Sequence, residues 1–110
     1  EEGGARAMRE LLARRPHLDA VFAASDVMAA GARQVLREAD RRIPEDVALI
    51  GFDDSVVARH MHPALTSVRQ PIEEMGRRMA QLLLEEIAGR VGEERPTVVL
   101  PTELVVRDSS

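Results

Sequence analysis

Polar side chains that could bind a small molecule follow three short apolar runs of this sequence. Their hydroxyl, carboxylate and amide groups can orient a hydroxylated ligand by hydrogen bonding. In open parallel sheets, ligands bind beyond the carboxyl ends of the strands, where a rigid backbone aims such groups. We therefore take as candidate ligand-binding residues Ser25, Asp26, Asp53 and Gln70.

Each candidate also has a purely structural interpretation. Ser25 and Asp26 are good residues for capping the N-terminus of a following helix. The Asp53-Asp54 pair suits a turn closed by side-chain hydrogen bonds, and Gln70 alone is compatible with an ordinary surface position. From spacing alone, both interpretations stay open.

Catalytic and metal-binding arrangements have weaker support. His60 and His62 could place two imidazoles on one side of an extended segment, but no third ligand stands at a motif-like spacing. Asp53-Asp54 resembles a phosphate-accepting pair, yet the chain has no Lys to complete such a site. Ser25 lacks the Gly-x-Ser-x-Gly context of a hydrolase nucleophile. We therefore expect a protein that is not an enzyme, with no catalytic residue, no metal site and no cofactor.

The composition limits the class of protein. The 110 residues suffice for one domain, and 45% hydrophobic with 31% charged residues is typical of a globular chain. The net charge of −4, with Arg residues interleaved with Glu and Asp, argues against direct DNA binding. No apolar run is long enough to span a membrane. The first residues carry no signal-peptide pattern, and the absence of Cys is compatible with a reducing compartment.

The candidate residues must be positioned by alternating helices and strands. Apolar residues at helical spacing predict three long helices, and short apolar runs predict strands that are covered on both faces. Residues 55–65 are expected to be irregular or to hold one short helical turn. This order predicts an α/β fold with an open parallel sheet and flanking helices. The predicted helices span 4–15, 26–39 and 71–89, and the predicted strands 19–24, 47–52, 66–68, 97–100 and 103–106.

Four linked segments of the chain stand out: Asp19–Ala32, Ile43–Asp54, Pro63–Pro71 with Met75-Gly76, and Leu100–Arg107. The second segment contains the most recognisable signature, a Pro-x-Asp-Val strand that ends in Gly-Phe-Asp-Asp. With these segments in the same order and with the same gaps, the chain resembles transcription regulators of the lactose/galactose-repressor type.

The resemblance implies a type I periplasmic-binding-protein-like fold, in which two subdomains hold a small molecule. This chain would be part of that effector-binding domain, with 1–70 and 101–110 in the C-terminal subdomain. Residues 71–100 would be a crossover helix and strand of the N-terminal subdomain. The resemblance also implies that Asp53 bonds ligand hydroxyl groups, that Gln70 lines the pocket, and that Ser25 replaces a common ligand-binding Asn beside Asp26.

In such proteins a sugar-like effector changes the angle between the subdomains and so controls binding to operator DNA. DNA contact would be made by an N-terminal helix-turn-helix that is absent from this chain, in a cytoplasmic homodimer. A periplasmic sugar-binding receptor of a transporter, which shares the fold, is the alternative, and a phosphotransfer or metal-dependent enzyme is a more distant one. The resemblance places the homodimer contact at Val27, Ala30, Gln34, Val56, Val57, His60 and Met61.

Overall fold

The computed structural model describes residues 1–90, 92 and 95–110, which form two compact units. The first unit comprises Glu1–Arg69 and Glu103–Ser110, and the second comprises Gln70–Thr102. The chain therefore leaves the first unit after Arg69 and re-enters it at Glu103. Each unit is described separately below.

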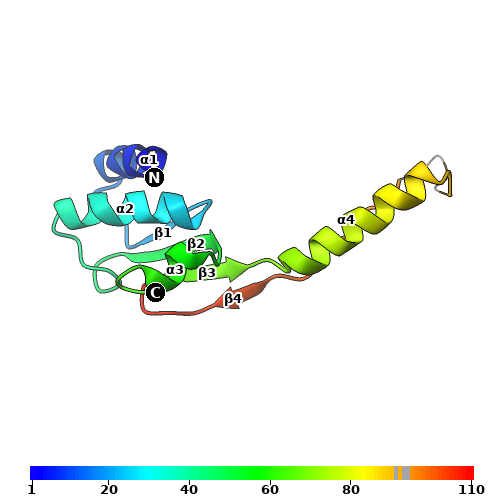
Figure 1. The fold of residues 1–110 in the computed structure, drawn as a ribbon. Helices are drawn as coiled ribbons and strands as arrows, with labels where there is room; N and C mark the ends of the chain where they lie inside the picture. Colours follow the sequence, from blue (N-terminus) through cyan, green and yellow to red (C-terminus); the bar gives the residue numbers. More distant parts are fainter. Residues whose placement is uncertain (91, 93–94) are drawn as a thin grey trace. The chain divides into compact units, whose positions relative to one another are not determined.

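The first unit is built on an open four-stranded sheet in the order β1-β2-β3-β4 (Figure 1). The strands β1, β2 and β3 run parallel, as expected, whereas β4 pairs antiparallel with β3 and makes the sheet mixed. The registers bring Val21 opposite Leu49 and Asp53 opposite Arg69. The strand bounds are β1 Ala20–Phe22, β2 Ala48–Asp53, β3 Thr66–Arg69 and β4 Glu103–Val105.

Two long helices are stacked on one face of this sheet, with α2 against β2 and α1 outside it (Figure 1). The two helices approach closely because glycines stand at their contact. A side chain at Gly4 would collide with the backbone of Met28, and one at Gly31 with the backbone of Glu1. The helices of this unit are α1 Glu2–Arg14, α2 Asp26–Glu38 and the short α3 Val56–His60.

The hydrophobic core lies between α2 and the sheet and is aliphatic. Its fully buried members include Met8, Leu36, Leu49 and Leu65. Alternation in β2 directs Leu49 and Gly51 into this core, while Ile50 and Phe52 remain half-buried. Close helix packing against the Leu49 side therefore defines the main core of the unit.

The prediction that the strands are covered on both faces is wrong for the first unit. In β1 only Val21 is partly covered, and Phe22 is 63% exposed. The alternation of β2 likewise leaves one face incompletely covered. The physical reason is that α1 and α2 form successive layers on the same face instead of covering opposite faces.

The second unit contains α4 Ile72–Ile87, which begins directly after Pro71 and ends before Gly89. Gly89 has φ +69, the left-handed conformation that terminates helices and that glycine adopts without strain. None of the residues of α4 is buried. Residues 97–100, predicted as a strand, have no regular secondary structure, because no described segment pairs with them.

Candidate functional site

Ser25 and Asp26 join β1 to α2 and hold different roles. The Ser25 hydroxyl accepts a hydrogen bond from the Met28 amide at 3.2 Å, so it caps α2. Asp26 is fully buried, and its carboxylate accepts bonds from the Ser67 hydroxyl and the Ser55 amide, each at 2.7 Å. Asp26 therefore connects the start of α2 to the segments that follow β2 and form β3.

Gly51 makes room for this buried carboxylate. A Cβ at Gly51 would collide with Asp26 and would press on the Leu65 side chain. The Gly of the Gly-Phe-Asp-Asp segment is therefore required by packing. It lies on β2, two residues before Asp53.

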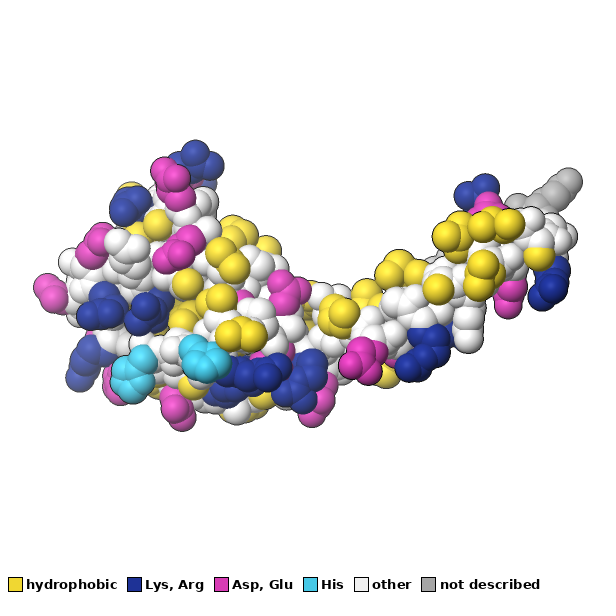
Figure 2. Space-filling view, in the orientation of Figure 1, with side chains coloured by type: hydrophobic (Ala, Val, Ile, Leu, Met, Phe, Trp, Pro, Cys, Tyr) yellow, Lys and Arg dark blue, Asp and Glu magenta, His cyan; other side chains and the backbone are white. Residues whose placement is uncertain are grey.

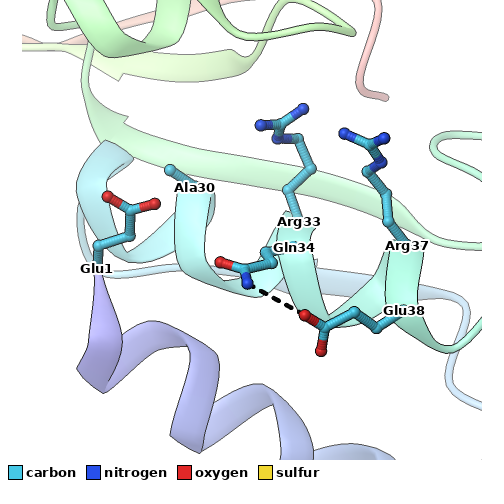
Figure 3. A pocket seen from close by; sticks show the side chains of 6 residues that line it. All are labelled: Glu1, Ala30, Arg33, Gln34, Arg37 and Glu38. Atoms are coloured by element: carbon cyan, nitrogen blue, oxygen red, sulfur yellow. Dashed lines mark hydrogen bonds between the residues drawn. The ribbon is translucent and has the colours of Figure 1, made fainter.

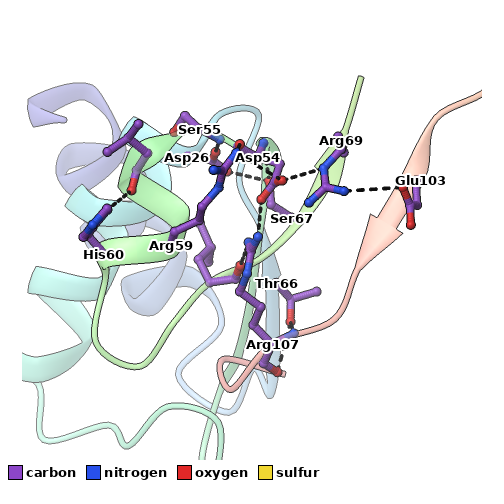
Figure 4. A network of polar contacts seen from close by, with 12 residues as sticks. Asp26, Asp54, Ser55, Arg59, His60, Thr66, Ser67, Arg69, Glu103 and Arg107 are labelled. Atoms are coloured by element: carbon purple, nitrogen blue, oxygen red, sulfur yellow. Dashed lines mark hydrogen bonds and ion pairs between the residues drawn. The ribbon is translucent and has the colours of Figure 1, made fainter. Parts of the chain in front are cut away.

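Asp54 is the second buried carboxylate at this edge, and arginines surround it (Figure 4). Arg107 approaches one carboxylate oxygen to 2.6 Å, and the Arg69 guanidinium donates to the other at 2.8 Å. The Arg59 guanidinium lies 3.9 Å from the oxygen that accepts from Arg69. Burial opposes ionisation of Asp54, but the hydrogen bonds and charges of Arg69 and Arg107 outweigh it and keep the pKa of this carboxyl below its ordinary value.

Asp53 stands at the end of β2 between these anchored groups and is exposed. Its φ of +113 lies in a region that residues with a side chain rarely adopt. Such a conformation persists only when its surroundings impose it. Here the buried and ion-paired Asp54 follows directly, and Arg69 is the register partner on β3. The fold therefore holds the Asp53 carboxylate at a defined place on the edge of the sheet.

Arg69 and Arg107 anchor this edge, whereas Ser109 binds the opposite, N-terminal ends of β2 and β3. None of the three was singled out from the sequence. Arg69 also pairs with Glu103 of β4 at 3.6 Å (Figure 4). The buried Ser109 hydroxyl donates to the Leu49 carbonyl at 2.6 Å and accepts from the Thr66 amide at 2.8 Å. The only available signal was that Arg107 and Ser109 follow the closing strand, which did not reveal their partners.

The structure brings three of the four predicted ligand-binding residues to one edge of the first unit. Ser25 and Asp26 follow β1, Asp53 ends β2, and the Asp26 bonds to Ser55 and Ser67 draw these strand ends together. Gln70 is the first residue of the second unit. The arrangement offers an oriented carboxylate on a rigid support and can bind hydroxyl groups by charge-assisted hydrogen bonds.

Comparison with known proteins identifies the family. The profile of the family described as periplasmic binding protein-like domain matches residues 1–110, the whole chain. This chain belongs to that family. The resemblance to the effector-binding domain of lactose/galactose-repressor regulators is also confirmed by individual relatives.

The regulator CelR of Thermobifida fusca is 56% identical over 98% of the chain and 32% of its own length. A solved structure of CelR with cellobiose is similar with a TM-score of 0.92 over 97% of this chain and 32% of that chain, also at 56% identity. A regulator from Arthrobacter sp. FB24, solved with lactose, has a TM-score of 0.85 at 32% identity, over 99% of this chain and 41% of that one. The chain thus spans about a third of the length of the regulator CelR.

In this periplasmic binding protein-like chain the predicted dimer residues divide into exposed and covered groups. Val27 and Val56 are 46% and 67% exposed, and Ala30 and Val57 are half-buried. The Gln34 amide donates to Glu38, and the His60 ring bonds to the Val56 carbonyl. Met61 lies in the hydrophobic core and offers little surface to a partner.

His60 and His62 belong to no cluster of possible metal ligands: among the described residues, no three His, Cys, Asp or Glu side chains are grouped so that they could hold a metal ion. His62 contributes its carbonyl oxygen to a hydrogen bond from Arg33. No helix in the described part of the chain is long and apolar enough to cross a membrane.

Proposed function

We propose that this chain is the effector-binding part of a bacterial DNA-binding transcription regulator that senses a sugar. The observation that carries the proposal is the exposed Asp53 carboxylate, held at φ +113 on a strand end beside the ion-paired Asp54. Sugars present several hydroxyl donors, which such a carboxylate can accept. The similarity to a regulator solved with cellobiose supports a disaccharide as the first effector to test.

The two compact units support a proposal for the organisation of the intact protein. Residues 1–70 and 101–110 would belong to the C-terminal subdomain, and residues 71–100 to the N-terminal one. Effector bound by both subdomains would favour one angle between them and so change operator binding in a homodimer. The DNA would be bound by a helix-turn-helix outside this chain, in the cytoplasm.

A binding role is favoured over catalysis and over a transport receptor. The relatives are transcriptional regulators. The carboxylates Asp26 and Asp54 are committed to internal hydrogen bonds and ion pairs, which leaves Asp53 as the exposed carboxylate of this cluster. In this proposal Ser25, Asp53 and Gln70 bind the ligand and no residue is catalytic. Asp26 orients the edge that carries the site.

Calorimetric titration of cellobiose into the protein that contains residues 1–110 tests the proposal. We expect saturable binding that weakens by roughly tenfold to a hundredfold in Asp53→Asn, because a charged hydrogen bond contributes about 1.5–3 kcal/mol. Asp19→Asn is the matched control, since Asp19 is an exposed carboxylate that precedes β1. If cellobiose does not bind, a thermal-shift screen of other sugars, sugar phosphates and purines follows. Unchanged affinity in Asp53→Asn for whichever ligand binds would remove Asp53 from the site.

A further inference from the structure

Two adjoining hollows lie along the C-terminal half of α2, away from the candidate sugar site. The first has a volume of about 390 Å³ and is lined by Glu1, Ala30, Gln34 and Glu38 besides two arginines. The second has a volume of about 300 Å³. Arg33 and Arg37 line both hollows, and their guanidinium groups extend in the same direction (Figure 3).

The second hollow, which we call the arginine pocket, has a strongly cationic lining. It is formed by Arg33, Arg37, Asp40, Arg41, Arg42, Ile43, His62 and Pro63. Arginine and histidine side chains of the first unit also lie close together on the surface in Figure 2. The acidic side chain in this lining is Asp40.

Most of this positive charge is not neutralised within the chain. Arg42 is paired with Asp46 by two hydrogen bonds. Arg33 and Arg41 instead donate to backbone carbonyls, those of His62 at 2.9 Å and Pro16 at 2.7 Å. The Arg37 guanidinium makes no hydrogen bond or ion pair with any residue that the structure describes. Three guanidinium charges therefore face a pocket that contains one carboxylate.

The Arg33 side chain carries the second observation. Its Nε atom is buried and has no hydrogen-bond partner among the described residues. A buried donor is normally paired, because leaving it without an acceptor is unfavourable. Like charges at positions i and i+4 of a helix, as in Arg33 and Arg37, also destabilise that helix. A cation near the helix C-terminus explains Arg37 alone, but it does not explain the unpaired Nε of Arg33.

We propose that the arginine pocket binds a small molecule through a phosphate group. A phosphate supplies several acceptor oxygens and two negative charges, which match the planar donor arrays of guanidinium groups. It would give Arg33 Nε an acceptor, and its negative charge would offset the repulsion between the guanidinium groups of Arg33 and Arg37. The volume of about 300 Å³ is at the lower end for small-molecule sites, which suits a compact phosphate ester better than a protein segment.

The arginine pocket is independent of the proposed sugar site. Its lining includes none of Ser25, Asp53 and Gln70. It adjoins the first hollow, which contains Ala30 and Gln34 of the predicted dimer contact. Failure of phosphate binding would therefore leave the sugar-sensing proposal unaffected, and loss of sugar binding in Asp53→Asn would leave the arginine pocket intact.

Inorganic phosphate is the probe for the test. It is titrated into the protein containing residues 1–110, with sodium chloride adjusted to constant ionic strength and amide shifts followed by NMR. We expect saturable shifts that include the amides of residues 33–43 and of His62. Arg37→Gln should weaken binding at least tenfold, and the double variant Arg33→Gln/Arg37→Gln should abolish measurable saturation. The Arg37 guanidinium makes no hydrogen bond or ion pair in the described chain, so its variant tests the pocket even if Arg33→Gln folds poorly.

The control is Arg14→Gln/Arg15→Gln, which removes the same net charge from the exposed end of α1. It should bind phosphate like the wild type. Equal weakening in the control would show general charge attraction and overturn the proposal. Linear shifts without saturation, or saturation that leaves residues 33–43 unaffected, would also overturn it.

Discussion

The Arg107 guanidinium near the end of the chain lies 2.6 Å from the carboxylate of Asp54, which is buried behind the exposed Asp53. This ion pair connects the strand that closes the sheet to the Gly-Phe-Asp-Asp segment. Arg69 approaches the same carboxylate from β3 at 2.8 Å. The edge that presents Asp53 is therefore held by charged contacts from three different strands or their ends.

Asp54→Asn is expected to lower the free energy of unfolding at pH 7 by roughly 2 kcal/mol, the loss of charge-assisted hydrogen bonds. The pKa of Asp54 is lowered by folding, so its contribution is present above the ordinary carboxyl pKa of about 4. It is lost as the pH falls through the folded pKa. The difference between wild type and variant should therefore shrink below about pH 4, measured by urea unfolding.

Asp46→Asn is the comparison for that experiment. The Arg42 hydrogen bonds lower the pKa of Asp46 to about 2, but this pair is at the surface. We expect a smaller loss of stability than for Asp54→Asn. An Asp54 difference that stays constant down to pH 2 would show that the ionised carboxylate is not what stabilises the edge.

Asp53→Ala and Asp53→Gly should separate ligand binding from backbone strain. Both variants remove the carboxylate, so both should lose roughly tenfold or more in effector affinity by calorimetry. Only Gly adopts φ +113 without strain, so Asp53→Ala should be less stable than Asp53→Gly by about 1 kcal/mol in thermal unfolding. Equal stability of the two would contradict the strained conformation, whatever happens to affinity.

The predicted dimer contact is tested at its exposed positions. Val27→Asp/Val56→Asp should convert a dimeric parent protein to monomers in sedimentation velocity, because two carboxylates would face an apolar interface. Met61 is unsuitable for this test, since it is part of the core and Asp there would bury an unpaired carboxylate. Ala13→Asp adds a carboxylate at an exposed position of α1 and should leave the dimer intact. Dimers that persist in the double variant would move the interface elsewhere.

The 110-residue chain by itself should associate through α4. Hydrophobic side chains are exposed along this helix in Figure 2, and Ile72, Met79, Leu83, Leu84 and Ile87 are each between 58% and 73% exposed. Covering them would contribute roughly 1.5–3 kcal/mol each. Light scattering at low micromolar concentration should show a dimer or larger species, and Met79→Glu/Leu83→Glu should reduce it. A monodisperse wild-type monomer would contradict this expectation.

The sequence by itself was sufficient for the family and for the order of the elements except the strand expected at 97–100, with most element ends within about two residues. Local signals set these features: Ser25 caps α2, Pro71 precedes α4, and Gly89 follows it in a left-handed conformation. Asp40, just after α2, is also left-handed, with φ +56, a conformation that Asp tolerates better than most residues. Each depends on neighbours in the chain, so periodicity and capping chemistry were enough.

Only the tertiary structure decided which polar residues are buried and which strands pair. Asp26, Asp53 and Asp54 look equivalent in the sequence, yet Ser67, Arg69 and Arg107 enclose two of them and leave Asp53 exposed. The apolar run 97–100 matches strand composition but has no described partner, so it forms no strand. Hydrogen-bond partners and strand neighbours come from distant parts of the chain, and local pattern carries no information about them.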